Sequence, residues 1–149
     1  MHTFLKLVAT GLNVGFITVA PGTFGTLATI PLIIITLKLS IFWKFLIFIT
    51  LLIVGIIASE YYEHYYDKGD PSEVVIDEIA AYYLVMIFTP YNLLNLFLSF
   101  IIFRFFDILK PYPIKNLEDN LSGGVGIMLD DIVAALYTII VMLILRIFI

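Results

Sequence analysis

The sequence predicts an all-α fold, a polytopic membrane helical bundle with re-entrant or broken helices, formed by a single integral membrane domain over residues 1–149. The first observation is the composition: 62% of the residues are hydrophobic and 13% are charged, whereas soluble domains have about 45–50% and about 25%. The second is the mean hydropathy of +1.08. The third is the alternation of long apolar segments with short polar ones, which is typical of polytopic membrane proteins.

The N-terminal part of the chain contains two apolar segments. Residues 20–40 are apolar apart from Lys38, and residues 41–58 are interrupted only by Lys44. A run of about 18 apolar residues is long enough to span a bilayer as a helix. We expect both lysines to extend their charged ends to one membrane interface. No cleavage site follows the short apolar N-terminus, so we expect it to belong to the mature protein.

A polar segment at residues 59–78 follows. It predicts a helix start, because Asp70 or Ser72 could cap a helix and Glu73 would then lie in the favoured first turn. Such a helix would place Glu73 and Asp77, which are four residues apart, on one face.

The same segment carries a second group of ionisable residues. Glu60, His64 and Asp67 would share a helix face and have a spacing compatible with a metal site. We interpret them as a solvated helix face, which is the more common origin of such a pattern.

The apolar segment at residues 79–103 is interrupted at residues 89–92. A straight span would put the polar segments 59–78 and 104–126 on opposite membrane faces, where their charges could not meet. We expect the chain to turn back near Pro90, because each arm would be only roughly 16–20 Å long and the hydrocarbon core is about 30 Å thick. A straight, tilted span is the alternative. With the turn, five basic residues share one face and three the other, which favours the first face as cytoplasmic.

Two acidic pairs lie where polar segments meet apolar ones. Asp77-Glu78 precedes one apolar segment, and Asp130-Asp131 follows the glycine-rich turn that ends at Gly126. Carboxylates at such positions are costly to desolvate and are usually functional. Hard cations such as Mg²⁺ prefer oxygen ligands, so the pairs predict a metal site. A favourable interaction of each pair with a helix dipole is the structural alternative.

Cationic groups that could bind phosphate lie nearby in the sequence. Arg104 and Asp107 are three residues apart and could pair, and Lys110 follows within one turn. Arginine and lysine beside a metal are natural partners of phosphate, although snorkelling to the interface would also explain them. The turn at residues 21–26 could offer backbone amides to a phosphate, but it lacks the Walker lysine, which argues against nucleotide binding.

Taken together, these segments resemble the phosphatidylglycerophosphatase A family, in the family's order and over most of the chain. The combination of F-R-x-x-D-x-x-K-P-x-P with G-G-x-G-I-M-x-D-D is highly specific. Ala81 and Ala135 stand where the family commonly has glycine. The matching stretches are residues 21–27, 75–78, 103–115 and 123–134.

The resemblance implies a Mg²⁺-dependent lipid phosphatase. We expect it in the bacterial inner (cytoplasmic) membrane, and the distribution of basic residues predicts its site on the cytoplasmic face. It would hydrolyse phosphatidylglycerophosphate to phosphatidylglycerol and phosphate. We favour attack by a water molecule activated by the metal, with an attacking aspartate as the alternative. The predicted catalytic residues are Asp77, Asp107, Lys110 and Asp131, the metal ligands are Asp77, Glu78, Asp130 and Asp131, and the substrate-binding residues are Thr23, Thr26, Arg104, Lys110 and Lys115.

Several other functions fit the sequence less well. A basic stripe for nucleic acid is missing, and the lack of cysteine excludes cysteine-nucleophile phosphatases. A CDP-alcohol phosphotransferase would need an aspartate-rich motif that is not present. A membrane ion or proton transporter that uses the boundary carboxylates is the main alternative, but it leaves the turn at residues 21–26 and the Lys110-Pro111 segment unexplained. The predicted partner is a phospholipid substrate, with no prediction for protein partners.

Overall fold

The computed structural model describes residues 2–67, 69 and 71–148, with the side chains of residues 118 and 119 also left undescribed. The described residues form α-helices and one short 3₁₀ helix and contain no strand, which confirms the predicted all-α membrane fold. The helices are α1 (His2–Ala9), α2 (Pro21–Thr36), α3 (Ile41–Tyr66), α4 (Ile76–Phe88), α5 (Leu93–Leu109), α6 (Ile114–Asn120) and α7 (Gly123–Phe148), with η1 (Val14–Phe16) between α1 and α2.

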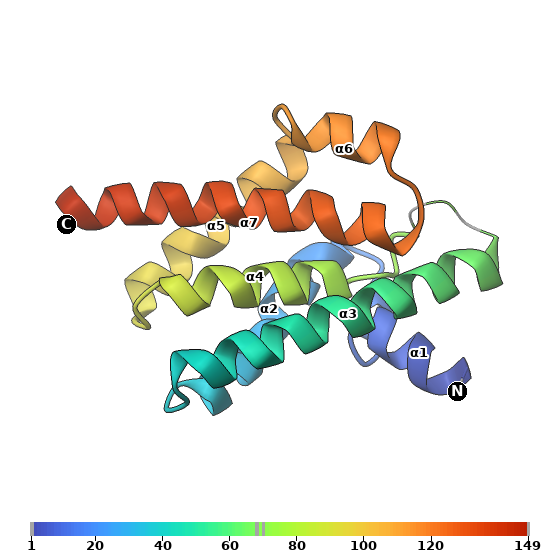
Figure 1. Ribbon diagram of the computed structural model, residues 1–149, viewed down its shortest axis with the longest axis horizontal. Helices are drawn as coiled ribbons and strands as arrows, with labels where there is room; N and C mark the ends of the chain where they lie inside the picture. Colours follow the sequence, from blue (N-terminus) through green and yellow to red (C-terminus); the bar gives the residue numbers. More distant parts are fainter. Residues whose placement is uncertain (1, 68, 70, 149) are drawn as a thin grey trace.

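Helix α4 is the centre of the bundle. It packs against α2, α3, α5 and α7, and Figure 1 shows it running between α3 and α7. Its residues from Ala80 to Met86 are all buried, because neighbouring helices cover every side of it. By contrast, α3 and α7 are the two helices long and apolar enough to cross a membrane, and much of their apolar surface stays exposed. The short helix is therefore shielded by the long ones.

The segment at residues 79–103 turns back as predicted. Helix α4 ends at Phe88, and α5 begins at Leu93 after a four-residue turn. Asn92 caps α5 by accepting a hydrogen bond from the backbone N–H of Asn95 at 2.8 Å. The Tyr82 hydroxyl on α4 then donates to the carbonyl of Leu96 on α5 at 2.9 Å. The two arms of the hairpin are thus held together, and the alternative of a straight span is wrong.

Two helix boundaries differ from the prediction. Helix α3 continues through the polar segment to Tyr66. Helix α4 begins only at Ile76, so Glu73 lies in the preceding turn and doesn't share a helix face with Asp77. Ser72 is therefore not a cap, and Asp70 lies outside the described residues. Packing in the interior of the bundle determines where α4 begins, because Val74, Val75 and Ile76 are all buried.

Glycines allow helices to approach closely at one end of the bundle. A Cβ atom at Gly124 would overlap the backbone carbonyl of Ile56, so α7 begins directly against α3. The Glu60 carboxylate on α3 accepts the N–H of Gly124 at 2.6 Å, which satisfies one unpaired amide of the first turn of α7. This contact places the N-terminal part of α7, with its acidic pair, beside the start of α4.

Candidate active site

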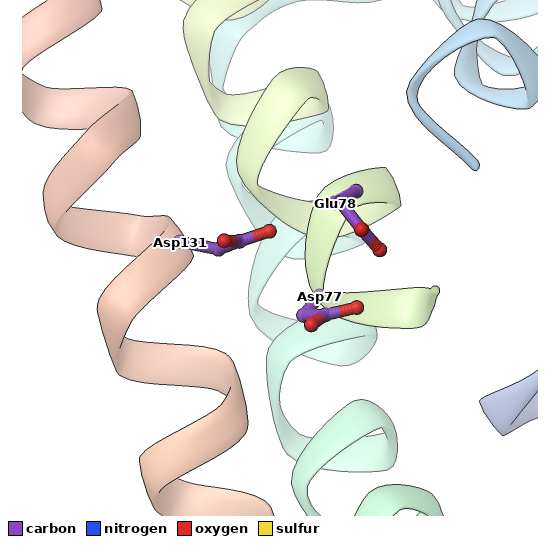
Figure 2. Close-up of side chains that lie close together, drawn as sticks. All are labelled: Asp77, Glu78 and Asp131. Carbon is purple, nitrogen blue, oxygen red and sulfur yellow. The ribbon is translucent and has the colours of Figure 1, made fainter. Parts of the chain in front are cut away.

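Three carboxylates from two helices converge at the start of α4. Asp77 and Glu78 lie in the first turn of α4, and Asp131 projects towards them from α7 (Figure 2). One oxygen of each lies within 4.8 Å of the others. Asp131 is 3% exposed. The buried oxygens Asp77 Oδ1, Glu78 Oε2 and Asp131 Oδ2 have no hydrogen-bond partner within the described part of the chain, so these oxygens are available to a cation or a proton.

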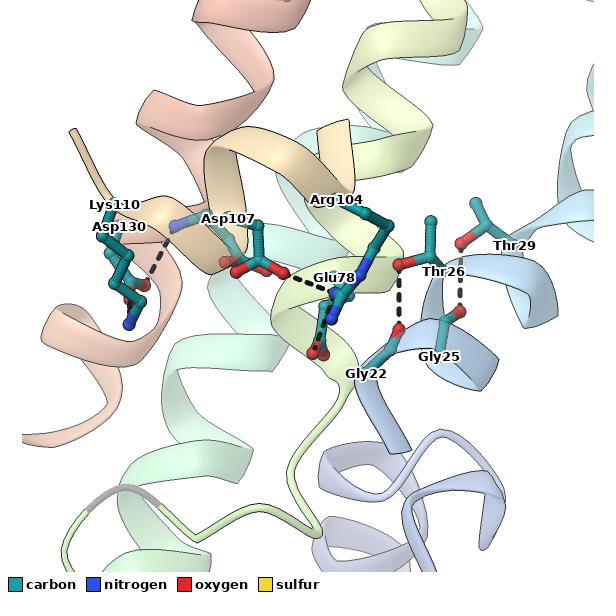
Figure 3. A network of polar contacts seen from close by, with 10 residues as sticks. Gly22, Gly25, Thr26, Thr29, Glu78, Arg104, Asp107, Lys110 and Asp130 are labelled. Atoms are coloured by element: carbon teal, nitrogen blue, oxygen red, sulfur yellow. Dashed lines mark hydrogen bonds and ion pairs between the residues drawn. The ribbon is translucent and has the colours of Figure 1, made fainter. Parts of the chain in front are cut away.

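Arg104 lies beside this carboxylate group, near the end of α5. It forms an ion pair with Asp107, one turn later on the same helix, and its Nη1 atom is 3.7 Å from Glu78 Oε1 (Figure 3). All three side chains are largely shielded from solvent. The two carboxylates therefore fix the direction of the guanidinium, as the predicted pairing of Arg104 with Asp107 requires.

Lys110 reaches the site from the residue that ends α5. It adopts a left-handed conformation with φ of 43°, and Pro111 follows, which stops the helix at this point. Its Nζ atom donates to Asp130 Oδ2 at 2.7 Å (Figure 3). Asp130 Oδ1 in turn accepts the backbone N–H of Asp131 at 2.9 Å. Asp130 therefore binds the Lys110 ammonium and is not one of the three carboxylates that lie close together.

These side chains line one cavity of about 370 Å³ at the end of the bundle. Sequence reasoning did not find the contribution of Pro71 and Ser72, which precede α4, or of Ile108 on α5. Only their position next to the acidic pair and the basic segment could have indicated them. The charged residues that line the cavity are Asp77, Glu78, Arg104, Asp107, Lys110, Asp130 and Asp131.

The start of α2 packs directly against the charged side chains. A Cβ atom at Gly22 would overlap Glu78 Oε1 and would lie 3.0 Å from Arg104 Nη1. Pro21, at the first position of α2, suits a helix start because its missing N–H is not needed there. Gly22 therefore contributes by leaving space for the Glu78 and Arg104 side chains.

The remaining predicted substrate-binding residues lie outside the cavity lining. Thr26 is fully buried, and its hydroxyl donates to the Gly22 carbonyl at 2.9 Å (Figure 3). Thr23 is half-buried on α2, and Lys115 is exposed on α6. The structure brings none of the three into the group formed by the other predicted residues.

A second acidic group lies at the same end of the molecule, on the last turns of α3. Glu60, Glu63, His64 and Asp67 line a separate cavity of about 330 Å³. Three of these residues, Glu60, His64 and Asp67, are exposed. Among the described residues, they do not form a group with ligand atoms close enough to hold one ion.

The arrangement suits chemistry on a phosphate. Two cations held by carboxylates can bind phosphate oxygens, and the three carboxylates with a buried oxygen that lacks a hydrogen-bond partner can hold a hard cation or accept a proton. The exposed apolar side chains Phe105, Ile108 and Leu109 lie on α5 close to the cavity, where a lipid tail could contact them.

Comparison with known proteins shows which family this chain belongs to. The model of the family "Phosphatidylglycerophosphatase A" matches residues 7–146, which is nearly the whole chain. The chain belongs to the phosphatidylglycerophosphatase A family. The predicted resemblance and enzyme class, a phosphoric monoester hydrolase, are therefore confirmed. Membership of a phosphatase family also argues against the transporter alternative.

Individual relatives agree with the family but do not all carry the same name. A phosphatidylglycerophosphatase A of Haemophilus influenzae is 38% identical over 92% of this chain and 85% of its own length. One of Escherichia coli is 33% identical over 86% and 75%. A putative phosphatidylinositol-3-phosphatase of Bacteroides thetaiotaomicron is 34% identical over 94% and 92%. No solved structure matches the chain.

Proposed function

We propose that this chain is a Mg²⁺-dependent phosphatase that hydrolyses phosphatidylglycerophosphate to phosphatidylglycerol and phosphate. The observation that carries the proposal is the single cavity in which three buried carboxylates lie beside Arg104 and Lys110. Family membership supports the reaction, and the apolar helices support a substrate held in a bilayer.

The residues present fit a hard divalent cation. Asp77, Glu78 and Asp131 each have a buried carboxylate oxygen without a hydrogen-bond partner in the described structure, and carboxylate oxygens are the ligands that Mg²⁺ prefers. A bound Mg²⁺ would supply positive charge that stabilises the charge developing on the phosphoryl oxygens. We place Asp130 beside this group rather than in it, because its carboxylate binds Lys110.

The two cations would bind and orient the phosphate. Lys110 and Arg104 line the cavity, and each is directed by carboxylates, Asp130 for the lysine and Asp107 with Glu78 for the arginine. Because these side chains are already held in place, little conformational entropy is lost when a phosphate binds. In this proposal Asp107 positions Arg104 and does not touch the substrate.

Hydrolysis requires a group that accepts the proton of the attacking water. Each carboxylate of the group would use one oxygen for the cation, so a second oxygen of Asp131 is free to take this proton. Water would add to phosphorus and give one proton to Asp131, and the bond from phosphorus to the lipid oxygen would break. The leaving oxygen would take a proton from solvent to form the product alcohol, and Asp131 would then release its proton to solvent. Asp131 is therefore the residue on which the proposed chemistry depends most.

The lipid that carries the phosphate is the finer part of the proposal. Two of the relatives described above are named for phosphatidylglycerophosphate and one for a phosphatidylinositol phosphate. The shared chemistry is a phosphate monoester on a lipid headgroup. The family model over residues 7–146 favours phosphatidylglycerophosphate.

The test is release of phosphate by purified protein from phosphatidylglycerophosphate, phosphatidylinositol-3-phosphate and phosphatidic acid in mixed micelles. We expect phosphatidylglycerophosphate to react fastest, a chelator to abolish the reaction, and added Mg²⁺ to restore it. Faster release from phosphatidylinositol-3-phosphate would reassign the substrate. Full activity in the chelator would refute the metal, and no release from any of these lipids would refute the function.

We also propose that the site faces the cytoplasm in a bacterial inner membrane. The positive-inside rule supports this orientation, and the hairpin of α4 and α5 supports placing both polar segments on one side. Single cysteines at Ser72 and Asn116, both exposed, should react from the cytoplasmic side of sealed vesicles in this cysteine-free protein. Reaction of both from the other side would invert the orientation.

A further inference from the structure

A second cavity lies at the opposite end of the bundle from the carboxylates. It has a volume of about 340 Å³, within the range of ligand pockets, which is about 300–1,000 Å³. It is enclosed by the end of α2, the first turn of α3, and the turn that joins α4 to α5. Trp43 and Lys44 lie in the first turn of α3, and residues of these types are typical of the level at which a helix enters a membrane.

Two side chains that line this cavity offer hydrogen-bond donors without a partner among the described residues. The Tyr83 hydroxyl is buried, with the residue 2% exposed, and it has no partner in the described part of the chain. Lys44 also lines the cavity, and its ammonium makes no ion pair with any described residue. The hydroxyls of Thr36 and Thr89 already donate to carbonyls of their own helices. An acceptor that carries negative charge would form the stronger hydrogen bonds with these two donors.

The charge distribution along the chain also makes this end of the molecule positively charged. All twelve Asp and Glu residues lie between residues 60 and 131 of the sequence. Among the residues that the structure describes, the end opposite the active site carries Lys38, Lys44 and Arg146 and no acidic residue. The wall of the cavity is otherwise apolar, with Ile33, Met86 and Ile87 among its residues. The surrounding helix surface is also apolar, because Ile35, Ile41 and Phe42 are exposed.

We propose that this cavity binds the headgroup of an anionic phospholipid from the leaflet opposite the active site. The phosphate would accept hydrogen bonds from Lys44 and Tyr83, and the acyl chains would lie along the exposed apolar surface of α2 and α3. A soluble anion would satisfy the donors equally but would not use the apolar surface, so the proposal commits to a lipid. The inference does not depend on the reaction at the other end.

Native mass spectrometry of the detergent-purified protein can test the proposal. The protein would be titrated with phosphatidylglycerol and, separately, with phosphatidylcholine of the same acyl chains. We expect the anionic lipid to be retained at least about tenfold more strongly, because both headgroups carry a phosphate but the choline cation of phosphatidylcholine would be repelled by the Lys44 ammonium. Lys44→Gln should remove most of this preference. Tyr83→Phe, which keeps the ring, should weaken retention by about threefold to tenfold.

Matched variants separate this site from other sources of binding. Lys38→Gln removes an exposed lysine at the same end that does not line the cavity, and it should keep the preference. Lys110→Ala alters the active site and should also keep it. The proposal is overturned if Lys44→Gln and Tyr83→Phe bind like wild type, if Lys38→Gln loses as much, or if Lys110→Ala abolishes retention. Displacement of the lipid by millimolar inorganic phosphate would show a soluble-anion site instead. Phosphate release by each cavity variant would show that it is folded.

Discussion

The two acidic groups at one end of this molecule are similar in sequence and different in structure. The first, which we call the buried group, consists of Asp77, Glu78 and Asp131. The second, the α3 group, consists of Glu60, Glu63, His64 and Asp67. Each carboxylate of the buried group has a partnerless buried oxygen, and two cations lie at the edge of this group. In the α3 group only Glu63 has such an oxygen among the described residues, and the other three residues are exposed.

The difference shows that burial, rather than the number of acidic residues, marks the reactive group. An exposed carboxylate is hydrated, so it costs little and requires no counter-charge. A buried carboxylate without a partner is costly, and it persists only where another group compensates for its charge. In the α3 group, Glu60 has a structural role because it caps α7. The following predictions test this contrast with paired changes in the two groups.

The largest effect is expected for Asp131→Asn. The change keeps the size of the side chain but removes the charge that would bind Mg²⁺ and accept a proton, so phosphate release should fall by more than about 1,000-fold. The control is Asp67→Asn in the α3 group, a residue in a left-handed conformation that asparagine also tolerates. It should keep full activity. Asp131→Asn activity within a few-fold of wild type at saturating Mg²⁺ would contradict the assignment.

Lys110→Ala should have the next largest effect. Loss of the ammonium removes a phosphate contact and leaves Asp130 without its cation. The transition-state stabilisation measured by kcat/KM should therefore fall by about 2–4 kcal/mol, with KM raised and kcat lowered. Steady-state kinetics on phosphatidylglycerophosphate would measure this split. Lys115→Ala, at an exposed position on α6, is the comparison. An equal loss at Lys115 would show that the substrate extends over α6.

Gly22→Ala should have a moderate effect through packing. The added methyl group would displace Glu78 and Arg104, and overpacking of this kind costs about 1–3 kcal/mol of stability. We expect about a tenfold loss of activity together with a lower thermal midpoint in detergent. Gly69→Ala is the matched change beside the α3 group, where an added Cβ would meet no atom within 4 Å. Equal behaviour of the two variants would refute the proposed role of Gly22.

His64→Ala should have the smallest effect. The side chain is exposed in the α3 group and lies outside the cavity of the buried group, so activity should stay within about twofold of wild type. The same phosphate-release assay with a Mg²⁺ titration would measure it. A large loss at His64, combined with an active Lys110→Ala, would move the site to the α3 group.

The sequence was sufficient to predict the topology where residues distant in the chain had to meet in one site. The hairpin of α4 and α5 followed from requiring that the charges of residues 59–78 and 104–126 meet, and the structure brings Glu78 and Arg104 to 3.7 Å. Composition alone did not distinguish it from a straight span. The family motifs contained every charged residue that lines the cavity.

Details that depend on three-dimensional packing were not predictable from spacing. The pairing of Asp130 with Lys110 results from the direction in which adjacent residues leave α7, so Asp130 and Asp131 face different partners. The start of α4 at Ile76 depends on burial of the residues before it, and local capping signals at Ser72 pointed elsewhere. Thr26 was predicted to bind substrate, but it is fully buried in α2.

The shortness of α4 has a consequence for the surrounding bilayer. At about 1.5 Å per residue, its 13 residues extend about 20 Å, while the 26 residues of α3 extend about 39 Å. A hydrocarbon core of about 30 Å is thicker than α4, so carboxylates at one end of α4 would lie about 10 Å below the headgroups if the other end reached the opposite interface. Hydrophobic mismatch of this size is relieved when the membrane thins locally around the protein. We therefore expect host lipids with shorter acyl chains to bring substrate headgroups closer to the catalytic depth than longer-chain lipids do.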